Sequence, residues 1–360
     1  QMAALGLVFN VLSGDAISVN QGVFIGAGAV LVYTLFGGMW SVALTTFVQM
    51  IVIVLGLLYV TWMAGDMAGG FSAVMAKASS EGKFDFLPTL DPTDMLAWVA
   101  ALLTMALGSI PQQDVFQRVN SSKDERVAIW GTTLGGLSYF FFAAVPLFLA
   151  YTATMIDNDM VLRLMEEDTQ LILPNLILNH MPFVAQVVFF GALLSVIMST
   201  ASGTLLAPSV TFSENVVKGF APGMSDKALL MTTRATVVGF TGFVTWYAVS
   251  TDSSIHQMVE NAYRVTLAGA FVPLAAGLFW KRANNLGATM AIVFGLGTWL
   301  SLELFGTEGN VEPQLIGLVA SAVGMLIGGL VGKPTPQHGA AGGPHHAHHA
   351  AAMTHHAHRR

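Results

Sequence analysis

The 360-residue sequence predicts an all-α polytopic membrane protein, and three observations lead to this prediction. Hydrophobic residues make up 54% of the chain, charged residues only 10%, and the mean hydropathy is +0.64. A soluble domain carries about 25% charged residues. Apolar runs of bilayer-spanning length recur along the chain, and none shows the period-two alternation of a membrane β-barrel strand.

The apolar runs are separated by clusters of Gly, Pro and charged residues, which mark the ends of membrane helices. They fall near 21–36, 40–64, 95–111, 128–153, 182–212, 228–249, 256–280, 285–305 and 313–331. A further apolar segment, QMAALGLVFNVLS, opens the chain but is shorter than the roughly 20 residues that a span requires. We therefore expect about ten helices, the first of them incomplete, with one or more helices ahead of Gln1.

Lys and Arg set the orientation, because they gather in cytoplasmic loops. One set of alternate loops holds Arg118, Lys123, Arg126, Lys218, Lys227, Lys281, Arg282, Lys333, Arg359 and Arg360; the opposite loops hold Lys77, Lys83 and Arg163. The richer set is expected to be cytoplasmic, and so is the C-terminus. The outer loops 65–94 and 154–181 are long, which predicts short interfacial helices or lids.

The chain is expected to divide into a transmembrane domain over 1–332 and a disordered, His-rich cytoplasmic tail over 333–360. The tail holds most of the ten His residues and no apolar pattern. Clustered imidazoles can bind metal, but a dispensable tail is the simpler interpretation. The sequence contains no Cys, so disulfides, thiolate metal sites and cysteine nucleophiles are excluded from it.

The apolar segment SVIMSTASGTLLAPS, residues 195–209, carries many hydroxyls. In one interpretation they bond back to helix carbonyls or join neighbouring helices. In the other they form an alkali-ion site, because a hard cation prefers oxygen ligands. Ser199 and Thr200 are adjacent, and the carbonyl of Val196 lies about one helical turn earlier.

Two more features suggest a transport pathway. GSIPQQDVFQR (108–118) places Gly108 and Pro111 near a helix end, where the helix should bend or unwind. Broken helices can line a cavity, although an ordinary helix end explains the pattern equally well. Glu260 and Arg264 lie four residues apart in an apolar run, the order that favours a helical ion pair. Snorkelling of Arg264 to the outer interface is the structural alternative.

Four segments together resemble the sodium:solute symporter family, the group of proline permease, sodium-glucose cotransporters and high-affinity choline transporters. They are YTLFGGMWSVALTTFVQM (33–50), IPQQDVFQRVNSSKD (110–124), FFGALLSVIMSTASGTLLAPS (189–209) and FVPLAAGLFWKRANNLGA (271–288). The order and spacing of the segments are similar across about 1–332. The resemblance implies the leucine-transporter-like fold, two inverted five-helix repeats that bind ions and solute near the bilayer midplane.

On that framework the chain starts within the third core helix, so the first and second core helices are absent. The resemblance implies that Ser199 and Thr200 bind sodium through their hydroxyls and Val196 through its carbonyl. The family usually has Asp where this chain has Thr46, and it often reads STADS where this chain reads STASG (199–203), so an Asp of the family falls at Ser202. Without these acids, the expected stoichiometry is one sodium ion.

For the solute, the resemblance implies a cavity lined by Gln112, Gln113 and Glu260. Gly136 stands where sugar transporters use a Lys, which argues against a sugar. Gln112 stands where choline transporters have a Trp, so a cation-π partner for choline is absent at this position. This makes choline a less favoured solute. An amino acid or similar zwitterion is favoured, with Glu260 as a partner for its ammonium group.

We therefore predict sodium-coupled secondary active symport of a small organic solute across the plasma membrane, in a bacterium the inner membrane. Na+ is the coupling ion, the protein is no enzyme, and no nucleic-acid partner is expected. A monomer is one option for the oligomeric state. Two alternatives remain: a membrane sensor module of the same fold, and an inactive, truncated transporter.

Overall fold

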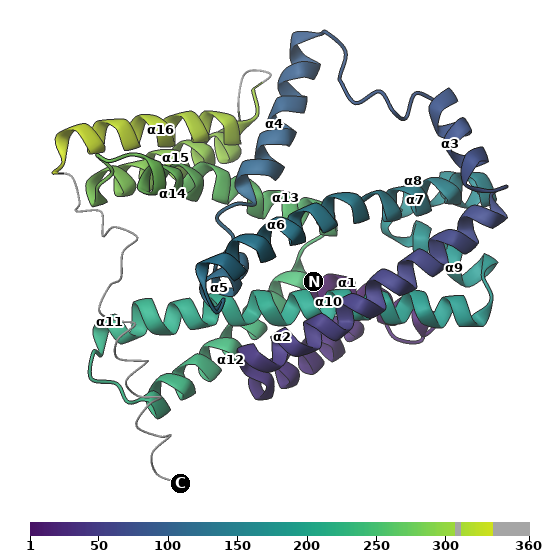
Figure 1. Ribbon diagram of the computed structural model, residues 1–360, viewed down its shortest axis with the longest axis horizontal. Coiled ribbons are helices and arrows are strands. Elements are labelled where there is room, and N and C mark those ends of the chain that lie inside the picture. The colour runs from purple at the N-terminus through teal and green to yellow at the C-terminus, as the bar shows by residue number, and fades with distance from the viewer. Residues whose placement is uncertain (307–310, 334–360) are drawn as a thin grey trace. The chain divides into compact units, whose positions relative to one another are not determined.

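A computed structural model describes residues 1–306 and 311–333, except for the side chains of 37–41. Within these residues the chain is helical and contains no strand (Figure 1). The α-helices are α1 (Met2–Leu12), α2 (Val19–Met67), α3 (Phe71–Ser80), α4 (Pro92–Gly108), α5 (Gln113–Asn120), α6 (Glu125–Phe142), α7 (Ala144–Ile156), α8 (Asn158–Glu167), α9 (Ile172–His180), α10 (Phe183–Thr211), α11 (Lys218–Phe220), α12 (Asp226–Ser250), α13 (Ile255–Thr266), α14 (Val272–Phe279), α15 (Asn285–Phe305) and α16 (Pro313–Val331). A 3₁₀ turn, η1 (Thr169–Leu171), and two π-helical segments, η2 (Phe212–Val217) and η3 (Leu267–Phe271), complete the described structure.

Nine helical stretches in the described part of the chain are long and apolar enough to cross a membrane. Their bounds are Val19–Phe36, Val42–Met67, Pro92–Asn120, Glu125–Ile156, Phe183–Phe220, Asp226–Ser250, Ile255–Phe279, Asn285–Phe305 and Pro313–Val331. They match the nine apolar runs predicted from the sequence, and α1 is the short segment at the start. Many large apolar side chains face outward, among them Phe36 at 84% exposure and Phe279 at 86%. Such a surface suits lipid rather than water.

The chain forms two compact units. The first contains Gln1–Leu87 and Gln112–Met258, and the second contains Pro88–Pro111 and the chain from Val259 onward. Each unit is therefore built from two separate stretches of sequence. The tail predicted for 333–360 lies outside the described residues apart from Lys333.

Helix α2 contains 49 residues, and a straight helix of that length would be about 74 Å long. The side-chain hydroxyls of Tyr33 and Thr45 nevertheless meet in a hydrogen bond. Twelve residues of straight helix would separate them by about 18 Å, so α2 reverses direction between them. Its two arms are the separate spans that the sequence predicts near 21–36 and 40–64.

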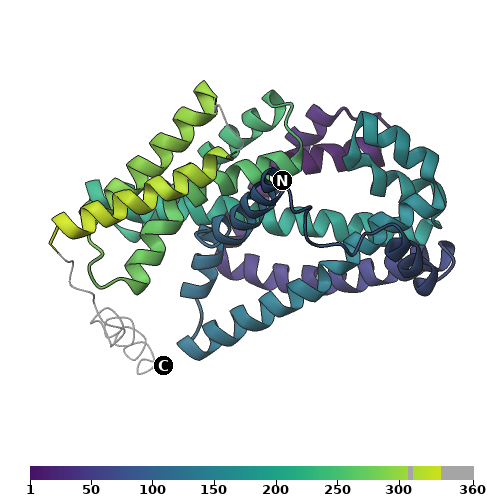
Figure 2. The same ribbon diagram turned by 90° about the horizontal axis from the view of Figure 1, so that it is seen from above.

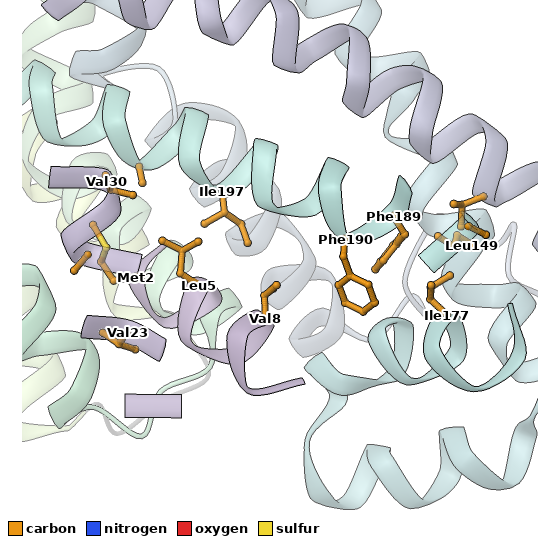
Figure 3. Packing of buried hydrophobic residues seen from close by; sticks show 14 of the residues in the cluster. Met2, Leu5, Val8, Val23, Val30, Leu149, Ile177, Phe189, Phe190 and Ile197 are labelled. Carbon is orange, nitrogen blue, oxygen red and sulfur yellow. The ribbon is translucent and has the colours of Figure 1, made fainter. Parts of the chain in front are cut away.

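The core of the first unit lies where α1, α2 and α10 pack together (Figure 3). Leu5, Val30 and Phe190 are almost completely buried there. Glycine permits two close approaches: Gly26 lies against the side chain of Leu5, and Gly56 lies against Val188 and Ala192. The first contact joins α2 to α1 and the second joins α2 to α10, which carries the hydroxyl-rich segment.

The two long outer loops contain short helices, as the sequence predicts. In the first loop, α3 packs on α7 through stacked rings of Phe71 and Phe148, 5.2 Å between centroids. In the second, α8, η1 and α9 form a hairpin with its own small apolar core. His180 Nε2 donates to Asp157 Oδ2 at 2.9 Å and closes the base of this hairpin.

In the second unit, α15 and α16 run side by side with η3 beside them (Figures 1 and 2). Glycines line this seam, and a Cβ atom on Gly295 would collide with the carbonyl oxygen of Ala268. On Gly317 it would lie 2.9 Å from Cβ of Trp299, and on Gly324 it would lie 2.5 Å from the carbonyl oxygen of Met290. The helix backbones therefore touch almost directly.

Candidate functional site

Helix α10 carries the hydroxyl-rich segment, and three of its six hydroxyls bond to carbonyls of their own helix. Ser202 donates to the carbonyl of Ser199 at 3.1 Å, Thr204 to that of Thr200 at 2.8 Å, and Ser209 to that of Leu205 at 2.7 Å. This back-bonding is how an isolated hydroxyl is accommodated in an apolar helix. For these three residues, the simpler interpretation of the sequence is correct.

Ser199 is an exception to this pattern. Its Oγ donates to Oγ1 of Thr46, on the second arm of α2, with 3.1 Å between the oxygens. Thr200, the next residue, has no side-chain hydrogen-bond partner in the described part of the chain, and its side chain is half-buried. The two predicted ligand hydroxyls are therefore among those that α10 itself does not satisfy.

Val196, Ser199 and Thr200 occupy positions i, i+3 and i+4 of α10, so they share one face of the helix. The Val196 carbonyl keeps a second lone pair after its helical hydrogen bond. One carbonyl and two hydroxyl oxygens are thus brought together on this face. That donor set is neutral and made of oxygen, which suits a hard monovalent cation.

Gln49 adds a further oxygen that the sequence analysis did not identify. Its Oε1 is buried and has no hydrogen-bond partner among the described residues. Gln49 lies three residues after Thr46 on α2, which runs antiparallel to α10, since Gly56 packs at Val188 and Thr46 at Ser199. Its side chain is therefore level with Val196. The i,i+3 spacing of Thr46 and Gln49 in LTTFVQ could have indicated that the two side chains share a face of α2.

Any ion held here would be bound without a cluster of acids. Across residues 1–306 and 311–333, no group of three or more His, Asp or Glu side chains could hold a metal ion. The candidate site on α10 and α2 relies on hydroxyl and carbonyl oxygens alone. Such a set favours a singly charged ion, because divalent ions are usually bound through carboxylates.

The predicted break near Pro111 is present. Helix α4 ends at Gly108, residues 109–112 are not helical, and α5 begins at Gln113. In the second unit, the Thr266 hydroxyl donates to the freed carbonyl of Gly108 at 2.5 Å. A Cβ atom on Gly108 would collide with the carbonyl oxygen of Tyr263, so glycine permits this approach.

The two predicted glutamines lie at the start of α5. Gln112 is the residue before the helix, and its side chain makes no capping hydrogen bond. Gln113 is exposed, and its Nε2 donates to Oγ1 of Thr211 at the end of α10, at 2.7 Å. In this arrangement the Gln113 amide links two helices of the first unit.

The Glu260–Arg264 ion pair is confirmed, with 2.9 Å between Glu260 Oε1 and Arg264 Nη2. A second carboxylate, which local spacing does not predict, is also close: Glu303 of α15 lies 3.8 Å from Arg264 Nη1. Both acids belong to the second unit, as does Arg264. Glu260 therefore belongs to the second unit, whereas Gln112 and Gln113 belong to the first. The resemblance had placed all three in one solute cavity.

Comparison with known proteins agrees with this geometry. The family model described as "Sodium:solute symporter family" matches residues 1–295. The human high affinity choline transporter 1 is 30% identical over 311 residues, which cover 82% of this chain and 51% of that protein. The high-affinity proline transporter of Bacillus subtilis is 28% identical over 326 residues, 89% of this chain and 67% of that protein.

A solved structure supports the same fold. It shows a Na+-coupled sialic acid symporter in a substrate-bound, outward-open state. The match covers 93% of this chain and 71% of the symporter chain. The TM-score is 0.70 at 17% sequence identity. The chain spans about half the length of the choline transporters that it matches.

Proposed function

The chain belongs to the sodium:solute symporter family, and on that basis we propose that it carries out sodium-coupled symport of a small organic solute. The observation that carries the proposal is the pair of hydroxyls on α10 that the helix does not satisfy. Ser199 faces Thr46 across the contact between α10 and α2, and Thr200 is adjacent to it. The Ser199–Thr46 bond also joins two helices, so the hydroxyl of Thr200 beside it, unpaired in the described part of the chain, is what favours an ion site.

Na+ is the proposed coupling ion, with Val196, Ser199 and Thr200 as its ligands. A dehydrated sodium ion needs several oxygens, and these three supply part of a shell. The ion and its ligands carry a single positive charge, since every ligand oxygen is neutral. One sodium per cycle remains our proposal, because Thr46 supplies a neutral hydroxyl rather than an acid.

The solute is proposed to be an amino acid or similar zwitterion, with Gln112 and Gln113 of the first unit as contacts; a contact from Glu260 of the second unit remains a prediction. The relatives are named for choline and proline, and both solutes are small and carry a positively charged nitrogen. Glu260 would balance such a nitrogen. The relatives are transporters, which accords with symport rather than catalysis as the activity.

The mechanism follows from differential binding. Sodium and solute bind from outside and stabilise an outward-open state, and they are released when the helices rock to an inward-open state. The membrane potential contributes about 2.3 kcal/mol per charge at 100 mV. In this proposal the loops rich in Lys and Arg, with the C-terminus, are cytoplasmic, and the membrane is the plasma membrane.

Uptake into proteoliposomes tests the proposal. We expect uptake of radiolabelled proline or choline under an inward Na+ gradient and little uptake when K+ replaces Na+. Ser199→Ala and Thr200→Ala should each raise the Na+ concentration for half-maximal uptake about tenfold, because each removes one ligand. Ser209→Ala is the matched control, since that hydroxyl bonds its own helix. Uptake that is equally fast in K+ would refute the proposal.

A further inference from the structure

Helix α5 lies against α10 on the side proposed to be cytoplasmic, and two contacts join them (Figure 1). The first is the hydrogen bond from Gln113 to Thr211. The second is a packing contact, in which the guanidinium group of Arg118 rests on the backbone of α10 at Gly203. Both helices belong to the first unit.

Glycine at 203 makes the second contact possible. A Cβ atom at this position would lie only 2.6 Å from Arg118 Nη2, so any larger residue would displace the guanidinium group. Asp114, one turn earlier on α5, accepts from Arg118 Nη1 at 3.2 Å and holds the side chain in its extended direction. The position of the positive charge is therefore fixed from two sides.

This charge lies next to the proposed sodium ligands. Gly203 follows Ser199 by four residues, so the two share a face of α10 and are about 6 Å apart along its axis. Gly203 is on the side toward Thr211, the proposed cytoplasmic end. A cation leaving Ser199 along this face would meet the Arg118 guanidinium group, which is 49% exposed and paired with Asp114, so it obstructs the path by its position more than by net charge.

Helix α5 is built so that it can move as one piece. It has eight residues, and the segments on both sides, 109–112 and 121–124, are not helical. Moving α5 away from α10 would break the Gln113–Thr211 hydrogen bond and the Arg118–Gly203 packing contact. Both can form again without rearrangement of α10.

From these observations we infer that Arg118, seated on Gly203, closes the cytoplasmic side of the proposed sodium site, and that α5 must leave α10 before the ion is released. The inference rests on the proposed function, since it assigns a gate to the same site. Arg118 is a gating and positioning residue in this scheme and does not bind the ion. Ala207 lies between Gly203 and Thr211 at i+4 spacing, so it shares their face of α10, and it is 1% exposed; a cysteine there is expected to become accessible when α5 leaves.

The absence of cysteine from the sequence permits a direct test with Ala207→Cys as the single reporter. A membrane-impermeant maleimide is applied to the cytoplasmic face of inside-out vesicles in Na+. We expect slow labelling in the parent, and labelling at least about tenfold faster with Arg118→Ala or Gly203→Ala, because each shifts the population toward the open side. Gly203→Ala favours the helix, so this variant should fold even if Arg118→Ala does not.

Two controls match these variants. Arg126→Ala removes another positive charge from the same side, and Gly191→Ala adds a methyl group to α10 where it meets nothing within 4 Å. Both should label at the parent rate. If Arg118→Ala and Gly203→Ala also label at the parent rate, the inference is wrong.

Labelling requires no transport, so failure of the inference can be told from failure of the proposed function. If Na+ slows labelling of the parent and drives uptake, but the two variants label at the parent rate, only the gate is refuted. If Na+ neither slows labelling nor drives uptake, the sodium-coupled function is refuted, and the gate with it.

Discussion

Ser199 of α10 donates a hydrogen bond to Thr46 of α2 across 3.1 Å, although 153 residues separate them in the sequence. The bond joins the proposed sodium ligand to the second arm of α2. It also keeps the Ser199 hydroxyl off its own helix, where Ser202 and Thr204 bond. Thr46 is therefore expected to control how Ser199 presents its oxygen.

Substitutions at Thr46 should change sodium affinity in opposite directions. Thr46→Val removes the acceptor and should raise the Na+ concentration for half-maximal uptake by about threefold to tenfold, because Ser199 can then bond back to α10. Thr46→Asp places a charged oxygen beside Ser199 and should lower that concentration. Uptake measured against Na+ concentration tests both. A higher Na+ requirement in Thr46→Asp would contradict the expected role.

The outer hairpin of α8 and α9 should loosen in acid. The hydrogen bonds from the Met160 amide and from His180 hold the pKa of the Asp157 carboxyl below its usual value of 3.8. Because the pKa is lowered in the folded state, these bonds stabilise the hairpin above pH 3.8, and the stabilisation is lost as the pH falls through the lowered pKa.

Pepsin cleavage within 158–180 measures this effect. Cleavage should accelerate below about pH 4 in the parent, after correction for the activity of the protease. Asp157→Asn keeps an oxygen to cap α8 but cannot titrate, so its corrected cleavage should not change with pH. Asp159→Asn, in the first turn of α8, serves as the charge control. A parent profile as flat as that of Asp157→Asn would exclude this role for Asp157.

The glycine seam of the second unit should tolerate no added methyl group. Gly295→Ala would press a methyl group onto the Ala268 carbonyl and should destabilise the fold by about 1 to 3 kcal/mol. Thermal unfolding of the detergent-solubilised protein measures the loss. Gly297→Ala is the matched control, because a Cβ atom there meets nothing within 4 Å. Equal melting temperatures for the two variants would show that the seam is looser than described.

The two carboxylates around Arg264 should contribute unequally. Glu260 is closer, at 2.9 Å, and its side chain is 25% exposed, whereas Glu303 lies at 3.8 Å and is 40% exposed. Glu260→Gln should therefore cost about 1 to 3 kcal/mol of stability and Glu303→Gln less than about 1 kcal/mol. Thermal unfolding of the two variants tests the order, and a larger loss in Glu303→Gln would reverse it.

Local patterns were enough to predict much of this structure. Proline chemistry located the break after Gly108, i,i+4 spacing identified the Glu260–Arg264 pair, and apolar length defined the nine spans. Each of these features depends on residues within a few turns of one another. The short helices in the outer loops followed from loop length alone.

Contacts between distant segments could not be predicted in the same way. Thr46 and Ser199, Arg118 and Gly203, and Arg264 and Glu303 each come from different helices. Their approach depends on how apolar faces pack, and nearly every face of these helices is apolar, so periodicity gives little information. The ligand roles of all six residues proposed for the two sites remain predictions: Val196, Ser199, Thr200, Gln112, Gln113 and Glu260.

The seam between α15 and α16 has a practical use in following the transport cycle. Its glycines bring the two backbones so close that an added Cβ would collide, and we expect the two helices to move together. A pair of spin labels on these two helices should therefore report one constant separation in every ionic condition. That separation would act as an internal ruler, against which changes measured between helices of the first unit can be calibrated.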